Sequence, residues 1–353
     1  MVQTVLNSIN ALPVWLQCLG GFTIGITLLV VGANWLVHGA VTIARRLGMP
    51  VLLVGLTIVA AGTSSPELAF NLSAAWDGHG DLCFGNVIGS NIANIGLVLG
   101  LCAVVGTLSV HSTIVKRELP WLVGITCIMV GLALLPTANL LRGKGEFGFG
   151  IIDGVIFLIF FGFILRFWYQ QARKDAKDPL VKEVTESTEA EVLPSLMLAI
   201  LYFLLGLSAL LVGGHVTKEA AIGTGELFGL SNTLIGLSVV AVATSLPELV
   251  TSIVAVRKGH ADLAIGNVIG SNIFNILLVL GITSLIAPVP LQPHWGIYDL
   301  FAMLLLTLVL FPIALSNQNK ITRIEGIMLF LTYLAYLAFS FLREYRADLF
   351  DWF

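Results

Sequence analysis

The sequence predicts an all-α polytopic membrane protein with ten transmembrane helices, arranged as two inverted five-helix repeats. Three observations lead to this prediction. The chain of 353 residues is 57% hydrophobic and only 11% charged, whereas a soluble domain carries about 25% charged residues. Ten apolar stretches are each long enough to cross a bilayer, which takes about 20 residues. Residues 55–100 are repeated as residues 236–281.

The predicted spans follow the hydropathy of the chain, whose mean value is +0.95. A polar stretch at 171–193 is charged and almost free of aromatic residues, which is typical of a linker. It divides the chain into a first repeat (1–170) and a second repeat (194–353). The spans are residues 16–40, 51–75, 82–108, 117–137, 148–170, 194–217, 232–256, 263–288, 297–315 and 324–342.

The distribution of Lys and Arg predicts the orientation. With the N-terminus outside, the inner loops hold 13 of the 18 Lys and Arg residues and the outer segments hold 5, as the positive-inside rule requires. Both termini are then outside and the linker is inside. The N-terminus has no basic region typical of a cleavable signal peptide. The net charge of −3 gives no basic surface for nucleic acid.

The internal repeat is the most informative feature. At a fixed offset of 181 residues, 28 of the 46 aligned pairs are identical. GLTIVAAGTSSPEL becomes GLSVVAVATSLPEL, and GNVIGSNIANI becomes GNVIGSNIFNI. Five spans are an odd number, so the second repeat enters the membrane upside down. Inverted repeats with interrupted helices are typical of secondary transporters whose site lies at the bilayer midplane.

Two glutamates stand at equivalent mid-span positions, Glu67 and Glu248, each directly after a proline. A proline interrupts the helix and frees a backbone carbonyl. A charged side chain at the bilayer centre costs roughly 2.5 kcal/mol or more. A matched pair of such residues therefore indicates a functional site rather than a packing contact.

The repeated GNVIGSN motif predicts a second wall for this site. Its polar residues recur at intervals of four, which places them on one face of a helix. The alternative for these side chains is hydrogen bonding between helices, and for the glycines we expect close helix packing. The polar residues are Asn86, Ser90 and Asn94 in the first repeat and Asn267, Ser271 and Asn275 in the second.

The site chemistry is that of oxygen donors: carboxylates, hydroxyls, amide oxygens and freed carbonyls. Such hard ligands suit Ca²⁺ and Na⁺, whereas Mg²⁺ gives up its water less readily. Two carboxylates neutralise one Ca²⁺, two Na⁺ or two protons. These ions are transported species, and no bound cofactor is expected.

The paired motifs GTSSPEL/ATSLPEL and GNVIGSNIxNI resemble the two α-repeats of the calcium/cation antiporter superfamily, the Na⁺/Ca²⁺ exchangers. VHSTIVKRELPWL (110–122) is also similar to the bacterial inner-membrane YrbG-like branch. The resemblance implies four cation subsites and location in the cell inner membrane. It implies side-chain ligands at Glu67, Glu248, Ser64, Ser245, Ser90, Ser271, Asn94 and Asn275, and carbonyl ligands at Ala60, Thr63, Ala241 and Thr244.

The chain departs from the family pattern at several positions. Many members have one Asp among the positions of Asn94 and Asn275, so this chain has one titratable group fewer, and the ion stoichiometry is open. Ala243 replaces a usual Gly and Ser65 a usual Leu.

These observations predict a secondary antiporter that exchanges Ca²⁺ for Na⁺ by alternating access. Ca²⁺/H⁺ exchange and a K⁺-dependent variant are alternatives, and a passive cation channel is a candidate from a different class. A membrane enzyme is disfavoured, because the spans offer no His or Lys base near the serines. The expected partners are Ca²⁺, Na⁺ and the lipid bilayer, without nucleic acid or a protein partner.

The remaining polar residues carry weaker predictions. The cysteines lie in apolar segments without CxxC spacing, so we expect small unpaired side chains. His79 and His260 stand in equivalent loops, where turn and helix-cap roles are favoured over ion entry. Asn34 and His38 fit packing and gating equally well. Trp352 and Phe353 suggest an anchor at the membrane interface.

Overall fold

A computed structural model of the chain describes residues 13–111, 114–135, 147–175, 193–228, 241–291 and 296–345. Most of the predicted linker (176–192), the first part of the predicted span 232–256, and the C-terminal Trp352 and Phe353 lie outside these residues.

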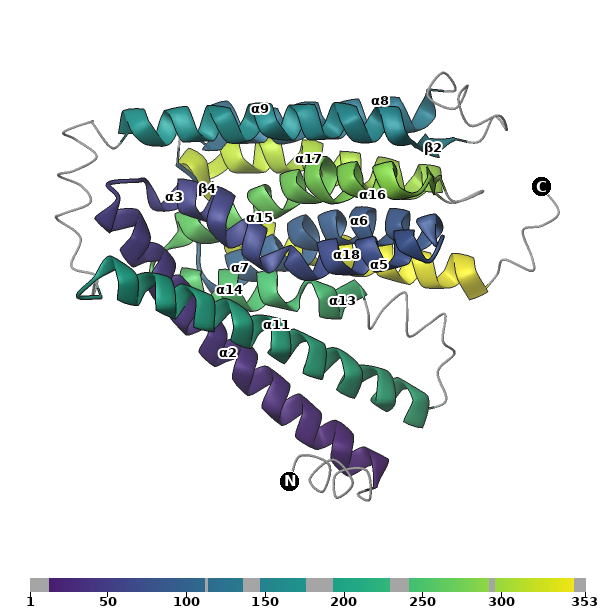
Figure 1. Cartoon of the computed structure of the whole chain (residues 1–353), viewed down its shortest axis with the longest axis horizontal. Coiled ribbons are helices and arrows are strands. Elements are labelled where there is room, and N and C mark those ends of the chain that lie inside the picture. The colour runs from purple at the N-terminus through teal and green to yellow at the C-terminus, as the bar shows by residue number, and fades with distance from the viewer. Residues whose placement is uncertain are drawn as a thin grey trace.

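The protein is built almost entirely from helices (Figure 1). They are α2 (Val14–Arg46), α3 (Val51–Val54), α4 (Ala60–Thr63), α5 (Ser65–Trp76), α6 (Gly80–Ala93), α7 (Gly100–Val105), α8 (Leu119–Leu134), α9 (Ile151–Asp175), α11 (Leu196–Leu227), α13 (Ala241–Thr244), α14 (Leu246–Arg257), α15 (Ala261–Phe274), α16 (Leu280–Ile286), α17 (Gly296–Asn319) and α18 (Arg323–Tyr345). The π-helical stretches are η1 (Gly55–Val59), η2 (Asn94–Leu99), η3 (Ile114–Glu118) and η6 (Asn275–Val279). Short strands are β1 (Leu108–Ser109), β2 (Gly148–Phe149), β3 (Val289–Pro290) and β4 (Lys320–Ile321).

Helices lie at the predicted spans wherever the structure describes them, although some of their ends differ. Among the described residues, eight helices are long and apolar enough to cross a membrane, and the pair Val51–Thr63 and Ser65–Trp76, bent by 42°, makes a ninth if it counts as one span. The remaining predicted span, 232–256, is described only from residue 241, where α13 and α14 continue it. The chain is therefore a membrane protein with many apolar helices.

Two helices are longer than their predicted spans. α2 has 33 residues and α11 has 32, which at about 1.5 Å per residue gives roughly 50 Å. This exceeds the bilayer core of about 30 Å, and both helices run obliquely to the rest of the bundle (Figure 1). The prediction was too short because both helices continue past the apolar stretch, through Arg45 and Arg46 in α2 and through Lys218 in α11.

Glycines bring α2 and α11 into close contact. Gly25, Gly32 and Gly39 recur every seven residues along α2. A Cβ atom at Gly32 would lie 2.7 Å from the carbonyl oxygen of Gly206, and one at Gly25 would lie 3.0 Å from that of Gly213. The two backbones therefore touch along a smooth seam, which larger side chains would prevent.

Helix α15 occupies the centre of the bundle. Every residue from Leu263 to Phe274 is buried. A Cβ atom at Gly270 would lie 2.5 Å from the carbonyl oxygen of Leu56, and one at Gly266 would lie 2.7 Å from that of Leu52. The prediction that these glycines permit close packing is confirmed for α15 against α3 and η1.

The two repeats have matching element bounds. α5 and α14, α6 and α15, and the strands β1 and β3 each correspond at an offset of 181 residues. β1 pairs antiparallel with β4, and β2 pairs antiparallel with β3. The ribbon that contains β4 and the ribbon that contains β2 lie at opposite ends of the molecule (Figure 1). Each ribbon thus joins a strand of one repeat to a strand of the other.

The equivalent turns before α6 and α15 depend on glycine. Gly78 has φ of 83° and Gly259 has φ of 80°, a left-handed conformation that glycine adopts without strain. His79 and His260 then occupy the N-cap positions, but neither side chain makes a capping bond to a described residue. The predicted turn is confirmed at both places, whereas the predicted capping by the histidine side chains is wrong.

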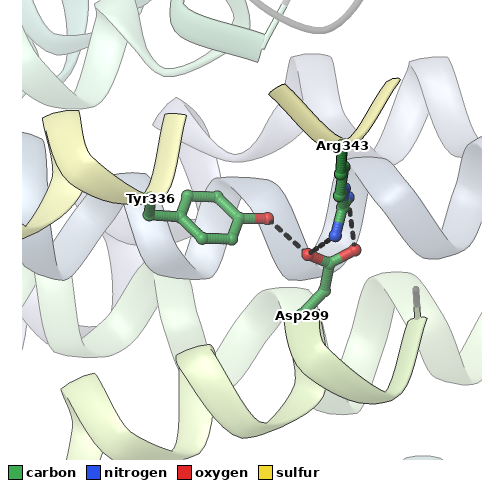
Figure 2. Close-up of polar contacts among 3 residues, drawn as sticks. All are labelled: Asp299, Tyr336 and Arg343. Carbon is green, nitrogen blue, oxygen red and sulfur yellow. Dashed lines mark hydrogen bonds and ion pairs between the residues drawn. The ribbon is translucent and has the colours of Figure 1, made fainter. Parts of the chain in front are cut away.

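Buried acids brace the outer helices of each repeat. Asp299 on α17 forms a bidentate ion pair with Arg343 on α18, with N–O distances of 2.7 and 2.9 Å, and accepts a 3.0 Å hydrogen bond from the Tyr336 hydroxyl (Figure 2). Its counterpart 181 residues earlier is Glu118. Glu118 contacts Arg117 Nε at 2.6 Å and accepts from Trp168 Nε1 at 3.0 Å. The first brace joins α17 to α18, and the second joins η3 to α9.

The cysteines behave as predicted. All lie within the described residues and are free thiols. Cys18, Cys83 and Cys102 are buried, whereas Cys127 is exposed on the apolar surface. They contribute as small apolar side chains.

Candidate cation-binding site

The first wall of the site is formed where two helices break. α4 gives way to α5 at Ser64 (φ −83°, ψ 7°), and α13 gives way to α14 at Ser245 (φ −88°, ψ 4°). A proline follows in the first turn of each new helix, a position where its missing N–H has no helical partner to lose. The breaks expose helix N-termini, whose dipole favours negative charge.

Glu67 and Glu248 lie in these first turns, fully buried at 1% and 0% exposure. Ser64 donates its hydroxyl proton to Glu248 Oε1 at 3.2 Å, which links the two repeats. Within the described part of the chain, Oε2 of each glutamate has no hydrogen-bond partner, and no Lys or Arg forms an ion pair with either.

The second wall comes from α6 and α15 and the π-helical turns that follow them. Asn94 is the first residue of η2 and Asn275 is the first residue of η6. π-Helical turns are rare in proteins as a whole, but those that occur are often found at functional sites. The wall residues are buried, with exposures of 2% for Ser90, 1% for Asn94, 0% for Ser271 and 0% for Asn275.

Asn86 and Asn267, predicted to line the site beside these residues, are instead engaged in bracing hydrogen bonds. Asn71 Nδ2 donates to Asn86 Oδ1 at 2.6 Å and to the carbonyl oxygen of Glu67 at 2.7 Å. Thr63 donates to Asn267 Oδ1 at 3.1 Å, and Asn267 Nδ2 donates to Ser252 at 3.1 Å. The alternative of hydrogen bonding between helices is correct for these two asparagines.

Sequence reasoning missed several of these partners. Asn71 and Ser252 each stand four residues after a site glutamate, on the same helical face. That spacing was a usable signal. Asn272, which directly follows Ser271, accepts from Asn94 Nδ2 at 3.0 Å. The sequence did not indicate a role for Asn272, because it lies outside the set of polar residues that recur every four positions.

The carbonyl ligands implied by the family resemblance lie at the ends of the short helices α4 and α13. The carbonyl oxygen of Ala60 accepts from the N–H of Ser64 at 2.9 Å. The Thr63 hydroxyl lies 3.4 Å from the same oxygen, but its single proton is donated to Asn267 at the shorter distance of 3.1 Å, so the Ala60 carbonyl keeps a second lone pair. Ala241 and Thr244 bound the four-residue helix α13, and Thr244 is buried at 9% exposure.

A cavity of about 280 Å³ adjoins the first wall. It lies between α5, α11 and the start of α14, and it reaches the prolines that precede both glutamates. Its lining residues are Pro66, Phe70, Leu211, Gly214, His215, Lys218, Ala243, Thr244 and Pro247.

The equivalent helices, α14 and α2, pack against each other. Asn34 on α2 corresponds to His215 on α11 at the offset of 181 residues. There α2 packs against α14, and Lys258 Nζ donates to the carbonyl oxygen of Asn34 at 3.3 Å. His38 packs edge-on against Tyr202 at 5.9 Å. The candidate site is therefore adjoined by a cavity beside α5 and α11, while α14 and α2 are in contact in the equivalent place.

The donor set suits a hard cation. Carboxylate, hydroxyl and amide oxygens surround the two breaks, and these are the ligands of Ca²⁺ and Na⁺. No group of three or more His, Cys, Asp and Glu side chains gathers anywhere in the described ranges, so the arrangement differs from a transition-metal centre.

Helices interrupted at membrane depth around buried carboxylates are characteristic of secondary transporters. The family model described as sodium/calcium exchanger protein matches residues 18–170 and 198–342. The chain belongs to the sodium/calcium exchanger family, within the calcium/cation antiporter superfamily. Members of this family are transporters rather than enzymes.

Relatives of the chain support the same assignment. It is 38% identical over 317 residues to the putative antiporter CaxA of Alkalimonas amylolytica, covering 89% of this chain and 95% of that protein. It is 34% identical over 315 residues to the inner membrane protein YrbG of Escherichia coli (strain K12), covering 89% and 94%. The resemblance to the exchangers and to the YrbG-like branch is confirmed.

A solved structure shares the fold. The sodium-calcium exchanger NCX_Mj, soaked with 10 mM Na⁺ and zero Ca²⁺, matches with a TM-score of 0.77 at 29% identity. The match covers 92% of this chain and 99% of NCX_Mj. The helix arrangement around the breaks is therefore that of a known exchanger.

Proposed function

We propose that this chain exchanges Ca²⁺ for Na⁺ by alternating access at a site between its two α-repeats. The observation that carries the proposal is the buried pair Glu67 and Glu248, which faces no cationic side chain among the described residues. Two buried carboxylates are costly unless a cation compensates them. One Ca²⁺ or two Na⁺ supply that charge equally, so the ions compete for one site.

The proposed ligands are the side-chain and carbonyl oxygens around the two breaks and the second wall. They are Glu67, Glu248, Ser64, Ser245, Ser90, Ser271, Asn94 and Asn275 through their side chains, and Ala60, Thr63, Ala241 and Thr244 through their carbonyls. The Ala60 carbonyl accepts from the Ser64 N–H and keeps a second lone pair that can bind an ion.

Alternating access is supported by the asymmetry around the site. The cavity beside Pro66 and Thr244 gives one approach, while α2 and α14 close the equivalent region. We propose that the chain is a ten-helix inverted repeat, in which the two repeats exchange these arrangements. The equivalent ribbons at opposite ends of the molecule support this inversion (Figure 1).

We further propose a bacterial inner-membrane location with both termini periplasmic and residues 171–193 cytoplasmic. The excess of Lys and Arg in the inner loops supports this orientation. Reporter fusions at Phe353 and Lys182 test it, and cytoplasmic reporter activity at Phe353 would contradict the ten-span topology.

Coupling to H⁺ or K⁺ instead of Na⁺ is the alternative within the same class, and it is open because Asn94 and Asn275 leave two carboxylates in the site. A passive channel is disfavoured by the closed packing of α2 against α14.

Uptake of radiolabelled Ca²⁺ into proteoliposomes under imposed ion gradients tests the function. An outward Na⁺ gradient should drive uptake, and replacing internal Na⁺ by choline should abolish it. Uptake driven only by an H⁺ gradient or only by a K⁺ gradient would show that H⁺ or K⁺, and not Na⁺, is the coupling ion. Uptake that needs no counter-ion would identify a channel.

A further inference from the structure

The two asparagines of the second wall are equivalent in sequence but not in structure. Asn94 and Asn275 each begin a π-helical turn, and both are buried. Asn94 Nδ2 donates to Asn272 Oδ1 at 3.0 Å. Asn275 forms no comparable bond, since neither of its amide atoms has a partner among the described residues.

The orientation of the Asn272 carboxamide follows from its own partner. Asn272 Nδ2 donates to the backbone carbonyl oxygen of Asn91 at 3.5 Å. A carbonyl oxygen can only accept, so the amide nitrogen of Asn272 must face Asn91 and its oxygen must face Asn94. The amide nitrogen of Asn94 is therefore turned toward Asn272.

The hydrogen bond to Asn272 also fixes the direction of the Asn94 side-chain oxygen. Oδ1 of Asn94 points away from Asn272, is buried, and has no hydrogen-bond partner in the part of the chain that the structure describes. A cation needs the oxygen end of a carboxamide, because the nitrogen end presents only donors. An oxygen that is already turned and held avoids the cost of ordering the side chain when the ion binds.

The equivalent residue in the first repeat does not perform this task. Asn91 corresponds to Asn272 at the offset of 181 residues. Its Nδ2 donates within its own helix to the carbonyl oxygen of Val87 at 2.7 Å, and its Oδ1 has no partner among the described residues. Asn275 therefore remains free to turn either end toward the site.

We propose that Asn272 is a positioning residue that fixes the Asn94 oxygen toward the transported cation, while Asn275 is an adaptable ligand. The inference rests on the proposed function, because it concerns the same cation site. Residues that orient metal ligands typically change metal affinity by about 10–100-fold when they are replaced. Loss of Asn272 should thus weaken Ca²⁺ binding without removing a ligand.

The test compares Asn272→Ala with the matched control Asn91→Ala. Both substitutions shorten a buried asparagine at equivalent places, so both carry a similar cost in packing. We expect Asn272→Ala to raise the KM for Ca²⁺ by about 10–100-fold while the maximal rate per folded molecule changes little. Asn91→Ala should leave KM nearly unchanged.

Asn272→Asp provides the rescue. A neutral carboxylic acid has the shape of the carboxamide, can accept from Asn94 Nδ2 and can donate to the Asn91 carbonyl. Asn272→Asp should restore most of the Ca²⁺ affinity that Asn272→Ala loses. Asn91→Asp should have a Ca²⁺ affinity no higher than that of Asn91→Ala. If Asn272→Ala does not fold, Asn272→Ser and Asn91→Ser give the same comparison, because serine is too short to hold the Asn94 amide.

The outcomes separate the inference from the proposed function. Equal KM values for the Asn272 and Asn91 variants, with normal Ca²⁺ exchange by the wild type, would overturn the positioning role alone. A wild-type protein that neither binds nor exchanges radiolabelled Ca²⁺ would overturn both. A raised KM in the Asn272 variants only, recovered in Asn272→Asp, supports the proposal.

Discussion

The two α-repeats, residues 55–100 and 236–281, have similar sequences and matching helix bounds but make different contacts. Ser64 donates to Glu248, whereas the equivalent Ser245 hydroxyl has no partner among the described residues. The two serines have similar backbone angles, so the difference lies in the side chains that surround them. A cavity lies between α5 and α11, whereas the equivalent helices α14 and α2 pack against each other.

A second kind of difference is permanent. Asn71 in the first repeat is replaced by Ser252 in the second. Asn71 donates to Asn86, whereas Ser252 accepts from Asn267, so the direction of the hydrogen bond is reversed. Comparing the repeats thus separates contacts that differ although the residues are identical from contacts that differ because the residues differ.

The largest effect should come from the pair that the repeats share. Glu67→Gln and Glu248→Gln should each reduce Ca²⁺ exchange by more than about 100-fold, because losing one charge of a buried ion pair costs at least about 3 kcal/mol. The folded protein should remain stable, since each change removes a costly buried carboxylate. Radiolabelled Ca²⁺ uptake measures the loss.

The double variant sharpens this comparison. Since both glutamates act on one site, it should add little to either single loss. A well-expressed Glu67→Gln protein that exchanges Ca²⁺ at a near-normal rate would refute the shared site. Glu67 and Glu248 variants that differ greatly would show that the repeats contribute unequally.

The next effect concerns the braces of the two repeats. Arg343→Leu should lower the free energy of unfolding by about 3–5 kcal/mol, because it leaves the buried Asp299 carboxylate unpaired. Arg117→Leu should cost less, since Arg117 is 18% exposed and Glu118 keeps its bond to Trp168. Thermal unfolding of the purified protein in detergent measures both.

The control for the brace removes both charges. Asp299→Ala combined with Arg343→Leu should recover much of the stability, since no buried charge is then left alone. If Arg117→Leu proves as damaging as Arg343→Leu, the ion pair of the second repeat is not the stronger brace.

A third prediction concerns Asn94 and Asn275. Asn275→Asp should keep Ca²⁺ exchange but move its half-maximal pH upward, because a third acid beside Glu67 and Glu248 opposes ionisation of the others. Asn94→Asp should impair exchange more, since it loses the donor to Asn272. Exchange rates between pH 5 and pH 9 test this, and an unchanged profile for active Asn275→Asp would place that residue outside the site.

The smallest effect should come from the loops before α6 and α15. Burial, Arg45 and Lys258 lower the pKa of His260, whereas the residue equivalent to Lys258 in the first repeat is Asp77. A lowered pKa means that the unfolded chain binds the proton first, so stability falls as the pH drops below about 6.5.

His260→Asn should remove this part of the pH dependence. The expected change between pH 7.5 and pH 5 is less than about 1 kcal/mol, because the side chain is only partly buried. Unfolding temperatures of wild type and variant at both pH values measure it. The same loss of stability at low pH in both proteins would exclude His260 as its source.

Much of the architecture could be read from the sequence because membrane helices must be apolar and about 20 residues long. The glutamates could be identified because an ionisable residue in the middle of an apolar span is costly and usually has a function. The ends of α2 and α11 were not, since hydropathy stops at Arg45 and Lys218 although the helix continues.

Other features of the site depend on packing that no local pattern records. The π-helical turns at Asn94 and Asn275 could not be predicted from the sequence, because such turns are stabilised by packing against neighbouring helices and not by a local pattern. The brace between Asp299 and Arg343 joins residues 44 positions apart. Ser64 donates a hydrogen bond to Glu248 and Ser245 has no partner among the described residues. The similar sequences of the two motifs do not predict this difference.

The two β-ribbons have a consequence for how the protein is made. β1 emerges from the ribosome early, yet its partner β4 at Lys320–Ile321 is among the last elements to be synthesised. β2 likewise waits for β3. The first repeat therefore enters the membrane with two unfilled strand edges and cannot close its ends alone. A nascent chain stopped before residue 289 would lack both partners, so completion of the fold is tied to completion of the chain.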